Sequence, residues 1–183
     1  IGRDESWPVC GESGIAPAVE VLPIPATTVK LGKDDGDRSY GWDNEYGYDK
    51  QKIEQFKVAT TLVSNQDFLK FVQAWGYRKA RYWTQEGRQW LACTKSQHPK
   101  FWRTTLSGKY LQRNLFSEMP LPMDWPVEVN YLEAKAYCNW MAERIGEPVR
   151  LPVEAEWYAL RQSELGEASG EGNINLEQYA SYC

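Results

Sequence analysis

The sequence has almost no histidine: His98 is the only one among 183 residues. A facial-triad iron site needs two histidines, and a zinc hydrolase usually needs two or three. A Ser-His-Asp arrangement would have to be built on His98 alone. This residue lies in the phrase "SQHPKFW", which contains no nucleophile motif. We therefore expect His98 to have a structural or solvent-facing role.

Cysteine is also scarce, and its spacing fits no metal or disulfide pattern. The four residues Cys10, Cys93, Cys138 and Cys183 include no CxxC pair. This argues against a zinc site and a disulfide framework, so we expect a reducing, cytoplasmic location. Cys138 falls on an apolar helical face, where a small core residue is expected.

Long apolar runs and a surplus of positive charge are missing. No stretch approaches the length that spans a bilayer, which excludes a membrane class. The net charge is −4, with Lys and Arg scattered along the chain, so nucleic acid is not expected as the main partner. The beginning, "IGRDESWPVC", has neither an initiator Met nor a signal-peptide layout, and we interpret the chain as a segment of a longer protein.

Aromatic residues, in contrast, are abundant, with 9 Trp and 11 Tyr. Such a composition favours an irregular fold in which large rings fill the core. At this length we expect one domain over residues 19–183, preceded by an extended lead-in over residues 1–18.

The periodicity predicts an α+β fold. Strands are expected over 19–24 and 27–31, and one or two more over 52–63 with apolar anchors ending at Leu62. Helices are expected from Ser64 to Gly76, from Asn130 to Gly146 and from Pro152 onward, with residues 77–126 as a long loop. The expected buried stripes are Phe68, Phe71, Val72 and Trp75; Ala134, Tyr137, Cys138 and Met141; and Val153, Trp157 and Leu160.

The stretch "SYGWDNEYGYDK" (39–50) places Asp43, Asn44 and Glu45 between aromatic residues. The two carboxylates could form an acid–base pair, but nothing in the sequence desolvates them. Three interpretations remain open. The cluster is a turn that its side chains stabilise, the wall of a substrate pocket or domain interface formed with Trp42, or an oxygen-ligand metal loop, and the turn is the commoner use of such residues.

A second group of candidates is the aromatic loop that holds Tyr82, Trp83, Trp90, His98, Phe101 and Trp102. Stacking on a histidine or thiol substrate is one interpretation. Packing beneath the long loop is the other, and burial habits favour it.

Several motifs in order resemble a known family. "VNYLEAKAYCNWMAERIGEPVRLPVEAEWYALR" is similar to the sulfatase-modifying-factor (formylglycine-generating enzyme) superfamily, with Val153 and Tyr158 where the family usually has Thr and Glu. "GWDNEYG", "YWTQEGRQW", "HPKFW", "LPMDWPVEVNY" and "GNINLEQYAS" narrow the resemblance to the central domain of 5-histidylcysteine sulfoxide synthases of ovothiol biosynthesis. Sulfoxide synthases of the ergothioneine pathway are the sister family.

This resemblance implies a C-type-lectin-like fold whose C-terminal part lies beyond Cys183. It implies an oxidoreductase that joins cysteine to the histidine ring with O2 and a non-haem Fe(II), whose three His ligands belong to a DinB-like helical bundle elsewhere in the parent chain. No catalytic residue is expected within this segment, which would form the non-iron wall of the pocket and dock the bundle. S-adenosylmethionine is implied only if a methyltransferase module follows.

The resemblance also implies part of a structural calcium site at Asn175 and Leu176, with a plain turn as the alternative. Two other functions stay open at this point. One is a non-catalytic lectin-like binding module, and the other is a formylglycine-generating, sulfatase-modifying enzyme. The sulfur donor, the ring position that reacts and the oligomeric state are not fixed by these residues.

Overall fold

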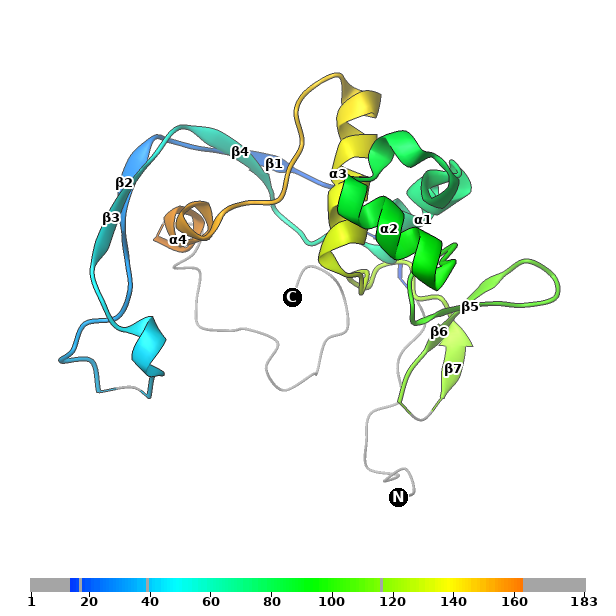
Figure 1. The fold of residues 1–183 in the computed structure, drawn as a ribbon, viewed down its shortest axis with the longest axis horizontal. Helices are drawn as coiled ribbons and strands as arrows, with labels where there is room; N and C mark the ends of the chain where they lie inside the picture. The colour runs from blue at the N-terminus through cyan, green and yellow to red at the C-terminus, as the bar shows by residue number, and fades with distance from the viewer. Residues whose placement is uncertain (1–13, 17, 39, 116, 163–183) are drawn as a thin grey trace. The chain divides into compact units, whose positions relative to one another are not determined.

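The computed structural model describes residues 14–16, 18–38, 40–115 and 117–162, which form two compact units (Figure 1). The large unit is built on Thr61–Leu151, and the small unit combines Val19–Thr60 with residues 152–162. The described residues contain four α-helices and three small antiparallel sheets, which confirms the α+β prediction. No helix among them has the length and apolar character needed to cross a membrane.

The large unit contains three helices and one three-stranded sheet. Its elements are α1 (Asn65–Gln73), the 3-10 turns η2 (Gly76–Arg78) and η3 (Ala80–Tyr82), α2 (Gln85–Thr94), β5 (Trp102–Thr104), β6 (Tyr110–Arg113), β7 (Glu118–Pro120) and α3 (Tyr131–Ile145). The sheet order is β5-β6-β7, and helix α3 contacts both α1 and α2 (Figure 1).

Helix α1 begins at the predicted cap. The Ser64 hydroxyl oxygen accepts a hydrogen bond from the Asp67 backbone N–H at 3.1 Å, which satisfies one of the donors left open at a helix start. The helix ends earlier than predicted, at Gln73, and Trp75 adopts a left-handed backbone with φ 63°. Trp75 is therefore 57% exposed, and its predicted place in the buried stripe is wrong.

Helix α3 confirms its predicted capping box. The Asn130 side chain accepts from the Glu133 N–H at 3.0 Å, and the Glu133 carboxylate accepts from the Asn130 N–H at 2.9 Å. Gly146 ends the helix with φ 73°, a conformation that glycine adopts without steric cost. Tyr137 and Cys138 are buried as predicted, whereas Ala134 and Met141 are only partly buried.

Aromatic rings fill the core of the large unit. The Phe68 ring stacks on Tyr137 with centroids 5.3 Å apart, and it meets Trp102 edge-on at 6.3 Å. Phe71 is fully buried, and its ring lies 5.6 Å from that of Trp140. Ring pairs of this kind contribute about 0.5–1.5 kcal/mol beyond the area that they bury. The prediction of an aromatic core is confirmed.

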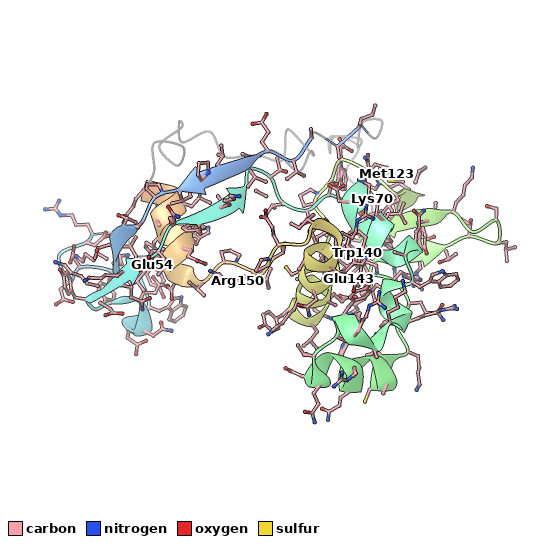
Figure 2. All side chains as sticks on the ribbon, turned by 90° about the horizontal axis from the view of Figure 1, so that it is seen from above. Glu54, Lys70, Met123, Trp140, Glu143 and Arg150 are labelled. Atoms are coloured by element: carbon pink, nitrogen blue, oxygen red, sulfur yellow. The ribbon has the colours of Figure 1, made fainter. Side chains whose placement is uncertain are left out.

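The outer turn η3 is tied to α3 by polar bonds. Arg81 Nη2 forms an ion pair with Glu143 Oε1 at 2.6 Å, and Asn139 Nδ2 donates to the Tyr82 carbonyl at 2.8 Å. Figure 2 shows Trp140 and Glu143 on the same helix. The hydrogen bond from Asn139 to the Tyr82 carbonyl is the stronger of the two connections, since an exposed ion pair contributes about 0–1 kcal/mol.

Helix α2 lies within the segment that we predicted as a loop, so that prediction is wrong. Thr84 caps it by accepting from the Gly87 N–H at 3.1 Å. The Trp83 and Trp90 rings stack with centroids 5.9 Å apart, one on each side of Gly87 in the sequence. A Cβ at Gly87 would lie 3.0 Å from the Trp83 ring, so a small residue suits this helix start.

The small unit contains two two-stranded sheets and one helix. Its elements are β1 (Val21–Ile24), β2 (Thr27–Leu31), the 3-10 turn η1 (Asp43–Glu45), β3 (Asp49–Ile53), β4 (Phe56–Ala59) and α4 (Glu154–Gln162). Strand β1 pairs with β4 and β2 with β3, all antiparallel, and α4 packs beside β2 and β3 (Figure 1). Leu62, a predicted anchor at the end of the strands, is 66% exposed, so this part of the prediction is wrong.

Helix α4 buries a different face from the predicted one. Ala155 and Ala159 pack against Ile24, Val29 and Ile53, because two alanines allow the helix to approach the strands closely. The predicted stripe instead points largely to solvent. Its exposed members are Val153 at 54% and Trp157 at 50%, and Leu160 is partly buried.

Candidate functional site

The predicted cluster Asp43-Asn44-Glu45 forms the 3-10 turn η1 at the end of the β2–β3 ribbon. The Asp43 carboxylate accepts from the Asn44 backbone N–H at 3.0 Å, and the Glu45 N–H donates to the Trp42 carbonyl at 2.9 Å. The Lys33 N–H holds the far end by donating to the Glu45 carbonyl at 2.9 Å. The turn is present as predicted, and Asp43 is the residue whose side chain bonds its backbone.

The aromatic side chains around this turn face solvent. Tyr40 is 77% exposed, Trp42 is 63% exposed, and their rings meet edge-on at 5.6 Å. We define these two residues, with Tyr48 at 63% exposure, as the aromatic rim of the small unit. The role of Trp42, Asp43, Asn44 and Glu45 as a substrate or interface wall stays a prediction.

The described residues do not supply a metal centre. Nowhere among them do three or more His, Cys, Asp or Glu side chains come together as a cation would require. Asp43 and Glu45 are both exposed, so water competes with any ion for their carboxylates. The residues present therefore do not fit an iron ion, and the predicted calcium positions Asn175 and Leu176 lie outside the described residues.

The large unit contains a cleft of about 660 Å³. This volume lies in the range of small-molecule sites in proteins. Its residues come from the end of α1 with η2, from the loop between α2 and β5, and from β5 and β6. His98 lies in its wall, with Nδ1 3.0 Å from the Pro99 carbonyl and its ring edge-on to Tyr110 at 5.7 Å. The sequence prediction missed this cleft, because its lining residues belong to several elements between Val72 and Tyr110 and only the folded chain brings them together.

A buried polar pair lies at one side of the cleft. The Tyr77 hydroxyl donates to Glu133 Oε1 at 2.6 Å, and only Tyr77 is part of the lining. Burial raises the pKa of Glu133, although the bonds from Tyr77 and Asn130 oppose that shift. Burial and the adjacent carboxylate also raise the pKa of Tyr77 far above its usual value, so the phenol keeps its proton and acts as a donor. The pair joins η2 to the start of α3.

The predicted aromatic loop is distributed between the core and its surface. Tyr82, Trp83 and Trp102 are buried, and Trp90 packs against the same cluster. The Trp83 indole N–H donates to the Gly76 carbonyl at 2.9 Å. Packing, the interpretation that burial habits favour, is confirmed for these rings. Cys138 is buried as predicted and Cys93 is exposed, and both are free thiols.

Comparison with known proteins places these observations in a wider context. The family described as "Sulfatase-modifying factor enzyme 1-like domain" matches residues 11–179 of this chain. The match includes the turn η1 and the cleft of the large unit, and it ends within the residues that the structure does not describe.

Three curated relatives illustrate the similarity. A hercynine oxygenase of Mycobacterium tuberculosis is 31% identical over 128 residues, which cover 69% of this chain and 28% of that protein. A hercynine oxygenase of Mycolicibacterium thermoresistibile is 31% identical over 149 residues, or 80% of this chain and 30% of the relative. "Inactive C-alpha-formylglycine-generating enzyme 2" of Bos taurus is 26% identical over 186 aligned positions, which cover 88% of this chain and 55% of that protein. The chain thus spans less than a third of the bacterial relatives.

Proposed function

This chain belongs to the sulfatase-modifying factor enzyme 1-like family, and from that premise we propose that it is part of a sulfoxide synthase. The parent enzyme would join cysteine to the histidine ring with O2, as in ovothiol biosynthesis. The α+β architecture with small antiparallel sheets agrees with the C-type-lectin-like fold of the family.

The observation that carries the proposal is the similarity to two hercynine oxygenases over 69% and 80% of this chain. Their names describe oxygenases, which supports an oxidative reaction rather than simple binding. The ordered motifs noted in the sequence favour histidine itself as the acceptor. Histidine against hercynine is therefore the substrate choice that an experiment has to resolve.

Within such an enzyme this segment would supply a wall and a docking surface rather than the metal. The described residues offer no cluster that fits iron, so we assign Fe(II) to a DinB-like bundle of the parent chain. We likewise assign S-adenosylmethionine only to a methyltransferase module, should the parent contain one.

The aromatic rim is the surface that we propose for docking the bundle. Tyr40, Trp42 and Tyr48 expose large ring areas on a turn whose backbone is held by Lys33. Exposed aromatic groups of this kind mark interaction sites, and Trp and Tyr dominate the binding energy of many interfaces. Because the turn is fixed before docking, little conformational entropy is lost when the partner binds.

The activity test uses the natural full-length protein with Fe(II), O2 and cysteine, and with either histidine or hercynine as the acceptor. We expect mass spectrometry to detect a cysteine–histidine sulfoxide and O2 consumption that depends on both substrates. A product formed with hercynine alone would assign the enzyme to the ergothioneine side. A parent chain without histidine-rich helices outside this segment would contradict the proposal.

Replacement of Trp42 tests the docking surface in the same protein. We expect Trp42→Ala to lower turnover at least tenfold, since an interface tryptophan commonly contributes about 2 kcal/mol or more. The matched control is Trp157→Ala, which removes another half-exposed tryptophan of the small unit and should leave turnover near wild type. Equal losses in the two variants would remove the support for a docking role of Trp42.

A non-catalytic binding module is the second candidate, because the name of the bovine relative describes it as inactive. This function predicts saturable ligand binding that needs no iron, and no O2 consumption with any acceptor. Formylglycine generation, the third possibility, predicts oxidation of a cysteine within a sulfatase peptide. The activity assay, run with that peptide as an additional substrate, distinguishes the three.

A further inference from the structure

The cleft of the large unit is lined by cations. Four of its lining residues carry a formal positive charge, whereas none of the described lining residues is Asp or Glu. The four residues approach from three segments, η2, the end of α2 and the start of β5. They are Arg78, Lys95, Lys100 and Arg103.

Neighbouring negative charges offset half or more of these four positive charges. Helices α1 and α2 both end beside the cleft, and each C-terminus carries roughly half a negative charge. Glu118 lies 3.8 Å from Arg103, close enough to offset one cation in part. The Glu133 carboxylate behind Tyr77 adds one more negative charge when it is ionised, because its hydrogen bonds from Tyr77 and the Asn130 N–H do not remove its charge. An excess of about one to two positive charges therefore remains, given those helix-end charges.

The backbone around the cleft holds two residues in an unfavourable conformation. Among the described residues, Trp75 at φ 63° and Lys95 at φ 57° are the non-glycine residues with a left-handed backbone, and both line this cleft. For an L-residue this conformation costs roughly 1–2 kcal/mol. Both residues end a helix, α1 and α2, where a left-handed residue is a common terminator, and the conformation fixes the direction of each side chain. Here it sets Trp75 under Arg78, whose guanidinium carbon lies 4.5 Å from the ring centroid.

Aromatic groups line the interior of the cleft. The Pro99 carbonyl is an acceptor only, so the His98 ring bonds to it through a protonated Nδ1. His98 Nε2 has no hydrogen-bond partner among the residues that the structure describes. The half-buried rings of His98 and Tyr110, which meet edge-on, offer aromatic surface next to the cations.

We propose that this cleft binds a small organic dianion, with its oxyanion groups on the cation rim and an apolar or aromatic part against His98 and Tyr110. Phosphate esters and dicarboxylates share this chemistry. Arg78 is the residue best placed to bind either in a bidentate manner, because stacking on Trp75 orients its planar guanidinium group. The site uses residues of the large unit alone and does not depend on the proposed sulfoxide synthase activity.

Calorimetric titration of the natural full-length protein tests the proposal. The probes are phenyl phosphate and phthalate, two aromatic dianions, and benzoate, an aromatic monoanion. We expect one of the dianions to bind at least tenfold more tightly than benzoate, and its affinity to fall as salt rises. The stronger of the two identifies phosphate or dicarboxylate as the preferred group. Binding of benzoate as tight as both dianions, or no saturable binding by any probe, would overturn the proposal.

Charge variants locate the binding. Lys100→Glu should weaken the preferred dianion at least tenfold, and Lys100→Gln should weaken it less because no repulsive charge is introduced. The matched control, Lys52→Glu, makes the same charge change at an exposed position of β3 in the small unit. Circular dichroism establishes that each variant is folded. An equal loss in Lys52→Glu and Lys100→Glu would show only a net-charge effect and refute the site.

Discussion

Gly76 is buried against the ring of Phe71, in a place that no side chain fits. A Cβ built on Gly76 would lie 2.2 Å from Phe71 Cε2, far below any real carbon contact. Phe71 has no exposed surface and is surrounded by other rings, so it has no room to move aside. The glycine is required here by close approach rather than by a positive φ.

We therefore expect Gly76→Ala to lower the free energy of unfolding by about 2–3 kcal/mol, the upper part of the range for overpacked cores. Urea denaturation followed by tryptophan fluorescence measures this loss. The matched control is Gly36→Ala, where the added Cβ meets nothing within 4 Å and the change should stay within about 0.5 kcal/mol. Similar losses at the two glycines would contradict the steric explanation.

Glu133 is a buried carboxyl whose ionisation should influence stability. Burial raises its pKa above the ordinary value of 4.5. The folded protein thus binds this proton more tightly than the unfolded chain, and the resulting stabilisation is complete below the unfolded pKa. It is lost as pH rises through the folded pKa.

Glu133→Gln removes this titration while keeping the size. The Gln oxygen can still accept from the Asn130 N–H, and its amide N–H can donate to the Tyr77 hydroxyl, which reverses the direction of that bond. We expect the stability of wild type minus that of Glu133→Gln to fall as pH rises from about 4.5, the ordinary Glu value, toward neutrality. Urea midpoints measured at several pH values for both proteins give this difference. Parallel profiles across that window would show that Glu133 contributes no pH dependence.

At the scale of elements, the capping box of α3 makes a separate prediction. Asn130→Ala removes the acceptor for the Glu133 N–H and should destabilise the protein by about 1 kcal/mol. Asn130→Asp and Asn130→Ser keep an acceptor at the cap and should retain most of that stability. Thermal unfolding of the three variants measures the effect. If Asp and Ser destabilise as much as Ala, the cap is not the cause.

Helix ends were predictable from sequence where a local signal determines them. Ser64 and Asn130 are side-chain caps, and Gly146 is a left-handed terminator, so each acts through backbone atoms within a few residues. Helix α2 was missed because its run "QEGRQWLACT" has only two large apolar residues and a glycine in the first turn. Thr84 before Gln85 was the one available signal.

Buried faces were less predictable, because they depend on what a helix packs against. At α4 the sequence favoured the large residues Val153 and Trp157, but the side chains that are fully buried against the strands are the small ones of Ala155 and Ala159. Trp157 instead faces solvent with Arg161, whose guanidinium carbon lies 5.6 Å from the ring centroid. Side-chain volume at a contact, which periodicity does not encode, decided the outcome.

At the scale of the whole molecule, the turn at Asp43–Glu45 was predictable because its bonds to Asn44 and Trp42 are local, whereas the bond from Lys33 was not predicted. The cleft was not, because it joins Trp75, Lys95 and Tyr110 from distant parts of the sequence, and nothing in the spacing of these residues brings them together. Four scattered cations gave no pattern along the chain, yet they converge once the helices have packed.

Iron removal provides a prediction at the same scale. If the parent is the proposed sulfoxide synthase, an Fe(II)-selective chelator should abolish turnover of the full-length protein. Because the described residues contain no cluster that fits iron, the fold of this segment should not change. We expect activity to return on addition of Fe(II), and hydrogen exchange of residues 61–151 to be unchanged throughout. Loss of protection in this range on chelation would indicate that metal supports the segment directly.

The small unit is assembled from two stretches of chain, and this has a consequence for synthesis on the ribosome. Ile24, Val29 and Ile53 are covered by Ala155 and Ala159, which follow roughly 100–130 residues later in the chain. At translation rates of roughly 5–20 residues per second, these apolar side chains stay uncovered for about 5–25 s. The residues between them include the large unit, which can complete its core in that interval. We therefore expect chaperones to bind the nascent chain at the paired strands β1–β4 and β2–β3, whose apolar face is exposed during this interval.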